Sequence, residues 1–285
     1  YLPELLNAEI SVAKNIKRLQ DCDEHIAASF DEVENVIART EYPPDESQRL
    51  ALDMALAESF CVITGGPGTG KTTTMRLLLE VLHTAGVQRI MLASPTGRAA
   101  KRLAEATGHE ASTIHRLLKF DPISGQFSKN EEEQLEVDYL VIDEVSMMDL
   151  KLCASLLSAV PDNAKVLFVG DADQLPSVGA GAVLRDFVAS ANIKTSRLER
   201  IHRQGKGSGI VSAAHAILNG EIPQTVQGDN GIGDFFISYH DDAEQATDVL
   251  QKVITERIPD KYGIDIDKDL LVLSPMYRGA LGVYV

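Results

Sequence analysis

The sequence predicts an α/β fold built on a parallel β-sheet, and two observations lead to this prediction. Four short apolar runs are separated by stretches with helical patterning, and each run is followed by small or polar residues. The runs are Cys61–Ile63, Ile90–Ala93, Tyr139–Ile142 and Val166–Val169. Strands that are buried on both faces of a parallel sheet are apolar throughout in this way. Ligands of such sheets bind beyond the carboxyl ends of the strands, so we expect the functional site at that edge.

The residues before the first apolar run predict three helices. Apolar residues follow helical spacing over 6–16 and again over 26–37. Pro43 and Pro44 then end the helical pattern. Asp45 is the predicted N-cap of a third helix that reaches about Glu58.

Two later regions depart from the strand–helix alternation. Residues 119–137 contain Asp-Pro and Ser-Gly pairs and an acidic run, which predict a small inserted hairpin. Beyond about Thr195 a second α/β unit is predicted, and two strands are too few for a stable parallel sheet, so we expect it to be incomplete. Its expected elements are helices near 208–219 and 243–257 and strands at Phe235–Ile237 and Leu270–Leu273. The predicted organisation is a helical segment at 1–42, a first domain at 43–195 and the beginning of a second domain at 196–285.

Composition excludes several classes of protein. Hydrophobic residues make up 44% of the chain, and no apolar run approaches the roughly 20 residues that span a bilayer. The N-terminus lacks the basic start of a signal peptide, and three widely spaced cysteines form neither a disulfide framework nor a CxxC pair. We therefore expect a cytoplasmic protein with no membrane partner. The net charge of −15 argues against a protein coated with nucleic acid, although a local basic groove remains compatible with it.

The first apolar run leads into a complete GxxxxGK[ST] motif, with a helical pattern after it. In this context the glycines let backbone N–H groups converge on phosphate oxygens at a helix N-terminus. Lys71 would reach the β- and γ-phosphates of ATP, and Thr72 would supply a hydroxyl to Mg²⁺. A glycine-rich turn without a ligand is the alternative, but such a turn does not need the lysine and threonine at this offset. The candidate nucleotide-binding residues here are Gly66, Pro67, Gly68, Thr69, Gly70, Lys71, Thr72 and Thr73.

Polar residues after two further runs complete the pattern of a nucleotide-hydrolysing site. Asp143 would hold the magnesium shell, and Glu144 would polarise the attacking water. Taken alone, this pair reads equally well as the acidic start of a helix. Gln174 follows the fourth run, where an amide can hydrogen-bond a γ-phosphate or the attacking water.

Taken together, these motifs resemble those of superfamily 1 helicases, and most closely the RecD/TraA-like group (exodeoxyribonuclease V alpha-like). The resemblance is strongest from Tyr42 to Gln204. The segments that carry it, besides the GxxxxGK[ST] motif, are Ser94–Ala100, Ser112–Leu118, Asp143–Ser146, Gly170–Gln174, Leu198–Gln204 and Leu273–Gly279. It implies RecA-like motor domains that use Mg·ATP to move 5′ to 3′ on single-stranded DNA and to open duplex junctions during recombination and repair. It also implies association with other subunits of a recombination nuclease complex.

The resemblance assigns further residues. Gln48 matches a glutamine that contacts adenine, Arg203 matches an arginine that reaches the γ-phosphate, and His202 stands where an aromatic residue often stacks on adenine. The positions that match DNA-contacting residues are Pro95, Thr96, Arg98, Lys101, Arg102, Thr113 and His115. A solvated helix face is the alternative for the basic residues, and a structural role is the commoner one for a lone histidine. The inserted hairpin matches the strand-separating element.

The sequence is compatible with two other functions, and it lacks two of the expected helicase motifs. The net acidity is compatible with a regulatory ATP-binding module that docks protein partners without moving, and an RNA helicase is a narrower alternative. The last two helicase motifs should follow Val285. We therefore expect residues 1–285 alone to bind Mg·ATP but to hydrolyse it slowly and not to unwind duplex.

Overall fold

A six-stranded parallel sheet forms the centre of the first part of the computed structural model, which describes residues 2–22, 28–199, 208–225 and 233–283. The strands lie in the order β3-β2-β6-β7-β1-β8, and every neighbouring pair is parallel. Their bounds are β1 Phe60–Gly65, β2 Ile90–Ser94, β3 Ala111–Thr113, β6 Tyr139–Ile142, β7 Lys165–Gly170 and β8 Lys194–Leu198. The four predicted strands are confirmed as β1, β2, β6 and β7. The two edge strands, β3 and β8, were not predicted.

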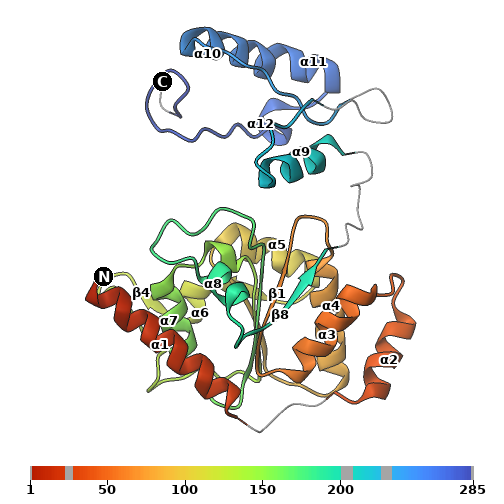
Figure 1. Ribbon diagram of the computed structural model, residues 1–285, viewed down its shortest axis with the longest axis vertical. Coiled ribbons are helices and arrows are strands. Elements are labelled where there is room, and N and C mark those ends of the chain that lie inside the picture. The colour runs from red at the N-terminus through yellow and green to blue at the C-terminus, as the bar shows by residue number, and fades with distance from the viewer. Residues whose placement is uncertain (1, 23–27, 200–207, 226–232, 284–285) are drawn as a thin grey trace. The chain divides into compact units, whose positions relative to one another are not determined.

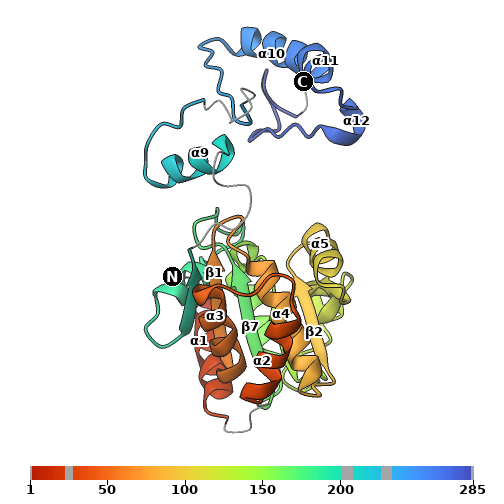
Figure 2. The ribbon, with the colours of Figure 1, turned by 90° about the vertical axis from the view of Figure 1, so that its right-hand side faces the viewer.

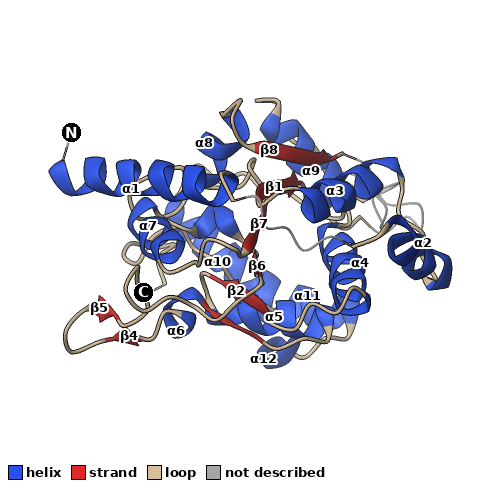
Figure 3. Ribbon diagram, turned by 90° about the horizontal axis from the view of Figure 1, so that it is seen from below, coloured by secondary structure: helices blue, strands red, loops and turns tan. Residues whose placement is uncertain are grey.

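Helices cover both faces of this sheet (Figures 1 and 2). One face packs against α1 Pro3–Gln20, α6 Ile114–Leu117, α7 Leu150–Ser158 and α8 Val183–Ala189. The other packs against α2 Phe30–Arg39, α3 Glu46–Ala57, α4 Lys71–Thr84 and α5 Gly97–Thr107. Figure 3 shows the strands passing between these two layers.

Alternate residues of the central strands serve the two hydrophobic cores. Phe60 and Val62 of β1 join the core on the α1 side, whereas Cys61 and Ile63 join the core on the α4 side. Side chains alternate between the faces of a strand, so a sheet covered on both sides needs apolar residues at every position. This is why the central strands read as continuous apolar runs.

The N-terminal helices are present, but the first two bury faces that differ from the predicted ones. Helix α2 begins at Phe30, which is exposed, and buries Val33 and Val36, while residue 26 lies outside the described residues. In α1 the buried residues are Val12, Ile16 and Leu19, whereas Leu6 and Ile10 are exposed. Asp45 is confirmed as the N-cap of α3, where its side chain accepts the N–H of Gln48 while the Gln48 side chain accepts the N–H of Asp45. Such reciprocal capping satisfies two backbone donors that a helix start leaves unpaired.

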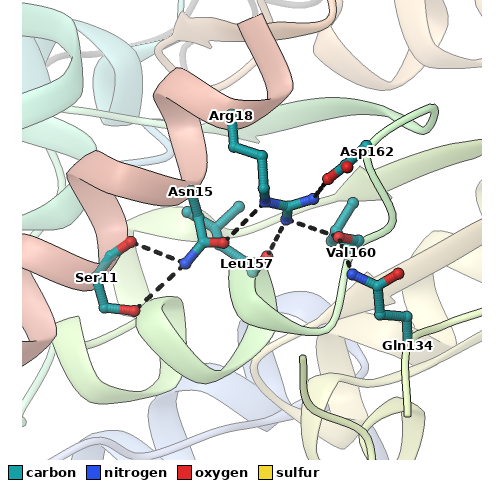
Figure 4. Close-up of polar contacts among 7 residues, drawn as sticks. All are labelled: Ser11, Asn15, Arg18, Gln134, Leu157, Val160 and Asp162. Carbon is teal, nitrogen blue, oxygen red and sulfur yellow. Dashed lines mark hydrogen bonds and ion pairs between the residues drawn. The ribbon is translucent and has the colours of Figure 1, made fainter. Parts of the chain in front are cut away.

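Arg18 fastens α1 to the end of α7 (Figure 4). Its Nη2 group donates to the carbonyl oxygens of Leu157 at 3.1 Å and Val160 at 2.7 Å, and its Nη1 group pairs with Asp162. Asn15 accepts from the Arg18 Nε group at 3.1 Å. A cation placed against the carbonyls at a helix C-terminus is favourable, so this contact anchors α1 to α7.

The predicted hairpin is present as β4 Phe120–Asp121 and β5 Gln126–Phe127, which pair antiparallel. After β6 a short 3₁₀ helix, η1, covers Val145–Met147. Within the described ranges, no helix is long and apolar enough to cross a membrane.

The chain divides into two units, residues 1–207 and 208–285. The expected boundary at 195/196 falls inside β8, because that strand pairs with β1 in the first sheet. The second unit contains α9 Gly209–Leu218, α10 Ala243–Lys252, a π-helical segment Val253–Arg257, α11 Ile258–Tyr262 and α12 Ile266–Asp269.

The strands expected in this second unit are not formed. Phe235 makes an isolated bridge and residues 270–273 have no regular structure, and Leu271 and Leu273 are exposed. A strand exists only through pairing, and in the described part of this unit no neighbouring strand offers its backbone groups. The expected helices near 208–219 and 243–257 are present.

Candidate functional site

The loop between β1 and α4 has a backbone that requires its glycines. Gly68 and Gly70 have φ angles of 78° and 88°, in the left-handed region that residues with a Cβ atom rarely adopt. A Cβ atom on Gly65 would lie 2.7 Å from the carbonyl oxygen of Leu198, so no larger residue fits there. Thr69 Oγ1 donates to the carbonyl oxygen of Gly66 at 2.8 Å. The loop therefore has a defined conformation at the start of a long helix, where backbone N–H groups can bind an anion.

The first turn of α4 presents the predicted phosphate-binding groups. Lys71 Nζ donates to the carbonyl oxygens of Gly65 at 2.6 Å and Gly66 at 3.0 Å, so the ammonium lies over the loop. Thr72 and Thr73 are exposed in the same turn. Gly70 is the N-cap and offers no side chain to the first N–H groups of α4. These donors and the ammonium together form a cradle for a polyphosphate.

Asp143 and Glu144 follow β6, two strands from the phosphate loop. Burial is the main cause that raises the pKa of Asp143 from its ordinary value of 3.8 to about 6, and the neighbouring Glu144 carboxylate also acts in this direction. The Glu144 N–H and the Lys71 ammonium act in the opposite direction. A partly buried carboxylate of this kind gains from a divalent cation, which would supply the missing positive charge.

The oxygen donors present fit magnesium. Asp143 offers a carboxylate and Thr72 a hydroxyl, and the described residues contain no cluster of three or more His, Cys, Asp or Glu side chains that could hold a metal by themselves. Mg²⁺ usually binds in this manner, through one or two protein oxygens together with substrate phosphates and water.

Asp143→Asn is expected to stabilise the metal-free chain. Because the pKa of Asp143 is raised in the folded protein, the folded state binds more protons than the unfolded state between about pH 4 and pH 6. The stability of the wild type should therefore fall as the pH rises through this window and stay low above it. The uncharged asparagine lacks this penalty, so the variant should gain about 1–3 kcal/mol at pH 7.5. Urea unfolding in EDTA at pH 5 and pH 7.5 measures this, and an equal difference between the two proteins at both pH values would contradict it.

Glu144 has an unusual backbone conformation. Its φ and ψ angles are 56° and 40°, and besides Lys119 it is the only residue other than glycine with positive φ among those described. Strained conformations at a non-glycine residue persist where the surrounding structure enforces them, often at functional sites. Here the bend redirects the chain from β6 into η1, immediately after the carboxylate of Asp143.

Gln174 lies beyond β7, between the strands that carry the phosphate loop and Asp143. Ser146 Oγ donates to Gln174 Oε1 at 3.4 Å. The structure therefore groups Lys71, Asp143, Glu144 and Gln174 at the carboxyl ends of three adjacent strands. His202 and Arg203 lie outside the described residues.

Gln48 lines a pocket of about 260 Å³ between α3, α4 and the segment that follows α2. Thr73 also lines it, as do Tyr42 and Arg76, which the sequence analysis did not single out. The Gln48 Oε1 atom is used in the helix cap, so its Nε2 group is the part of the amide that could meet a nucleobase. The sequence did contain a signal for Tyr42, since it stands three residues before the Asp45 cap and close to Gln48. An exposed aromatic ring that lines the same pocket as Gln48 can pack against a base.

The candidate DNA-contacting residues lie farther along the same sheet edge. Ser94 at the end of β2 pairs in register with Thr113 at the end of β3, which brings their two segments side by side. The hydroxyls of Thr96 and Thr113 accept the N–H groups of Ala99 and Arg116 as helix caps. These two threonines therefore have a structural role as well. Pro95 is partly buried at the same edge, and the side chains of Arg98, Lys101 and Arg102 are exposed on α5.

His115 packs against the hairpin. Its ring lies 5.4 Å from the ring of Phe120 and 5.6 Å from that of Phe127, measured between centroids. The contact with Phe120 is edge-to-face and the contact with Phe127 is tilted; edge-to-face packing stabilises aromatic pairs. The histidine thus connects the β3–α6 segment to the hairpin, while remaining exposed.

The chain is similar to a described protein family and to several named proteins. Residues 48–180 match the family model described as an AAA domain. The chain is 41% identical over 223 residues to the ATP-dependent RecD2 DNA helicase of Deinococcus radiodurans, a match that covers 78% of this chain and 30% of that protein. It is 41% identical over 193 residues to the RecBCD enzyme subunit RecD of Mycolicibacterium smegmatis, covering 59% of this chain and 35% of that protein. The chain thus spans about a third of the length of these two relatives.

The chain is also similar to a phage helicase and to a solved helicase structure. The chain is 30% identical over 238 residues to the ATP-dependent DNA helicase dda of Enterobacteria phage T4, covering 74% of this chain and 54% of that protein. Among solved structures, the Pif1 helicase from Candida albicans is 22% identical with a TM-score of 0.49, covering 67% of this chain and 46% of that one.

Proposed function

Because the chain belongs to the RecD-like DNA helicases of superfamily 1, we propose that its first unit is the ATP-hydrolysing motor domain of a helicase that moves along single-stranded DNA. The observation that carries this proposal is the order of polar residues along one sheet edge. The strands β6, β7 and β1 end in the nucleotide-directed residues, whereas β2 and β3 end in the DNA-directed segments. One edge would therefore bind both ligands side by side, which suits a domain that couples hydrolysis to movement.

Each residue of the nucleotide half has a role that its chemistry supports. Lys71 and the N–H groups of α4 bind the phosphates, and Thr72 and Asp143 hold Mg²⁺, which neutralises phosphate charge when bound. Glu144 accepts a proton from the attacking water. Gln174 hydrogen-bonds the γ-phosphate or that water. Arg203 would add positive charge at the γ-phosphate, and Gln48, Thr73 and His202 would contact the base.

In the DNA half, exposed cations would neutralise phosphates while Pro95, Thr96, Thr113 and His115 contact the strand. Arg98, Lys101 and Arg102 all lie on α5 within one and a half turns of its N-terminus. Phosphate contacts position a protein without reading sequence. A motor needs this property, because it has to pass over any base.

The DNA track is tested by the salt dependence of binding. Each phosphate contact with a single strand contributes about −0.7 to the slope of log K against log salt. The double variant Lys101→Ala/Arg102→Ala is expected to flatten that slope by about 0.7–1.4, depending on whether one or both side chains contact phosphate. Fluorescence anisotropy of a labelled oligonucleotide at several salt concentrations measures it. Lys151→Ala on α7 is the matched control and should leave the slope unchanged. An unchanged slope in the double variant would show that Lys101 and Arg102 do not contact DNA phosphates.

The hairpin is proposed to separate the strands of a duplex. Ile123 at its tip is 98% exposed, and the Asp121 carboxylate accepts the N–H groups of Ile123 at 2.9 Å and Ser124 at 3.2 Å. An apolar residue on a fixed turn suits insertion at a base-pair junction. The acidic residues Glu131–Glu133 lie in the following loop, where Lys129 pairs with Glu133 at 2.9 Å.

The proposal also covers the nucleic acid that the whole protein binds, its partner subunits, its direction of movement and its role in repair. The names of the relatives support a role with DNA rather than RNA, and the name RecBCD enzyme subunit RecD supports association with other subunits of a recombination enzyme. Movement from 5′ to 3′ and a role in repair rest on the family resemblance. A regulatory ATP switch remains the competing function, and stimulation of ATP turnover by single-stranded DNA distinguishes the two.

A further inference from the structure

The turn at residues 170–174 crosses the carboxyl ends of neighbouring strands. It leaves β7 at Gly170, which pairs in register with Thr64 of β1, and Thr64 pairs in turn with Arg197 of β8. The N–H of Ala172 donates to Thr64 Oγ1 at 3.2 Å. The turn therefore leans from β7 across β1 toward β8.

Arg197 holds the far side of this turn. Its Nη2 atom lies 2.7 Å from Oδ2 of Asp173. The next residue, Leu198, is the register partner of Gly65, and a Cβ atom on Gly65 would lie only 2.7 Å from the Leu198 carbonyl oxygen. Arg197 thus joins the turn to β8 at the point where β8 touches the first residue of the phosphate loop.

Two hydrogen bonds within the turn hold its backbone, but the Gln174 side chain is weakly held. Asp171 is 4% exposed, and its Oδ1 atom and carbonyl oxygen accept the N–H groups of Asp173 at 3.0 Å and Gln174 at 3.2 Å. The Gln174 amide is exposed, and its contact with Ser146 is long at 3.4 Å. The position of this amide therefore depends on where the turn as a whole is held.

The ion pair contributes little to stability. The side chains of Arg197 and Asp173 are 53% and 39% exposed, and such surface pairs are worth about 0–1 kcal/mol. The ion pair would affect the rate through the position of the turn. A displacement of about 1 Å in a group that meets the reacting atoms can cost up to about 10²-fold in rate.

We propose that Arg197 is a positioning residue for Gln174. Its ion pair with Asp173 fixes the turn over the phosphate loop, so that the Gln174 amide meets the γ-phosphate of bound ATP. This role rests on the proposed function, because it assigns Gln174 to that phosphate.

The kinetic test uses both partners of the pair in the natural protein. Arg197→Ala and Asp173→Ala are each expected to lower kcat about threefold to fivefold, the most that so exposed a pair can account for, with KM and the Kd for Mg·ADP within twofold of the wild type. The double alanine variant should lose no more than either single one, since both remove the same contact. The reversed pair, Arg197→Asp with Asp173→Arg, should recover most of the lost rate. A rate unchanged in both single variants, or losses that add without recovery in the reversed pair, would overturn the proposal.

A second readout needs neither hydrolysis nor nucleotide. Residues 1–285 contain no tryptophan, and Leu175, next to Gln174, is 87% exposed, so Leu175→Trp places the one tryptophan of this stretch beside the turn. In the nucleotide-free protein, adding Arg197→Ala should lower the steady-state anisotropy of this tryptophan. Arg89→Ala is the matched control, because its ion pair with Asp138 lies at the opposite ends of β2 and β6. It should leave both the anisotropy and kcat unchanged.

The outcomes separate this inference from the function on which it rests. A wild type that neither binds nor hydrolyses Mg·ATP would overturn the proposed function and this role with it. An active wild type whose Arg197→Ala variant keeps its anisotropy and its kcat would overturn the role of Arg197 alone.

Discussion

Replacement of Lys71 by alanine is expected to weaken the binding of Mg·ADP and Mg·ATP by about 10²–10³-fold. The Lys71 ammonium lies over the loop, within 3.0 Å of two loop carbonyls, and would exchange these contacts for the β- and γ-phosphates. Two charge-assisted hydrogen bonds at about 1.5–2 kcal/mol each account for this loss, at about 1.4 kcal/mol per tenfold. Isothermal titration calorimetry with Mg·ADP measures it directly.

The control for Lys71 is another lysine of equal charge. Lys14 is exposed on α1, away from the phosphate loop, so Lys14→Ala should bind nucleotide like the wild type. Because α4 begins at Lys71, the unfolding midpoint of Lys71→Ala must also be compared with that of the wild type. If the Lys71→Ala variant is folded and binds nucleotide with unchanged affinity, the phosphate loop is not part of the nucleotide site.

Glu144→Gln is expected to lower ATP turnover by about 10²–10⁴-fold, the usual contribution of a general base. Nucleotide affinity should stay within twofold of the wild type, because in the proposed site Asp143 and Thr72 would still hold the cation and Lys71 would still contact the phosphates. Steady-state turnover and nucleotide titration on the same preparation test both statements. Equal losses of affinity in Glu144→Gln and Lys71→Ala would contradict the division of roles.

The backbone of Glu144 offers a second, independent variant. Its left-handed conformation costs a residue with a Cβ atom about 1 kcal/mol, so Glu144→Gly should be as inactive as Glu144→Gln but more stable than it by up to that amount. Lys119 has a φ of 53°, and Lys119→Gly should gain similar stability while keeping DNA-free turnover. A glycine at 144 that lowers stability would show that the side chain, rather than the backbone, determines the strain.

The sequence was sufficient for the central strands and for the edge where the candidate site lies. Continuous apolar runs can be recognised without knowledge of the fold, and the GxxxxGK[ST] motif has a fixed place after such a run. The edge strands were missed for the opposite reason. The residues of β3 are all half-buried and β8 contains Lys194 and Arg197, so neither strand has an apolar run. Pairing with a neighbour, which is a tertiary property, makes them strands.

Other errors had similar physical causes. In α1 two sets of apolar residues both follow helical spacing, and only the docking of its C-terminal half on α7 determines that Val12, Ile16 and Leu19 are buried. In the second unit the apolar residues at 270–273 were predicted as a strand, but no pairing partner lies among its described residues. Arg197 escaped notice because an arginine in a polar segment has no pattern. Its contact with Asp173 joins residues 24 positions apart.

The measurement that tests the central claim most directly is the ATP turnover of the natural protein with and without single-stranded DNA, beside the Lys71→Ala variant. If one sheet edge binds both ligands, single-stranded DNA should raise the turnover of the wild type, and the variant should show neither basal nor stimulated turnover. High salt should abolish the stimulation, because it weakens the phosphate contacts. Turnover that is abolished by Lys71→Ala but indifferent to single-stranded DNA would contradict the motor and favour the regulatory ATP switch.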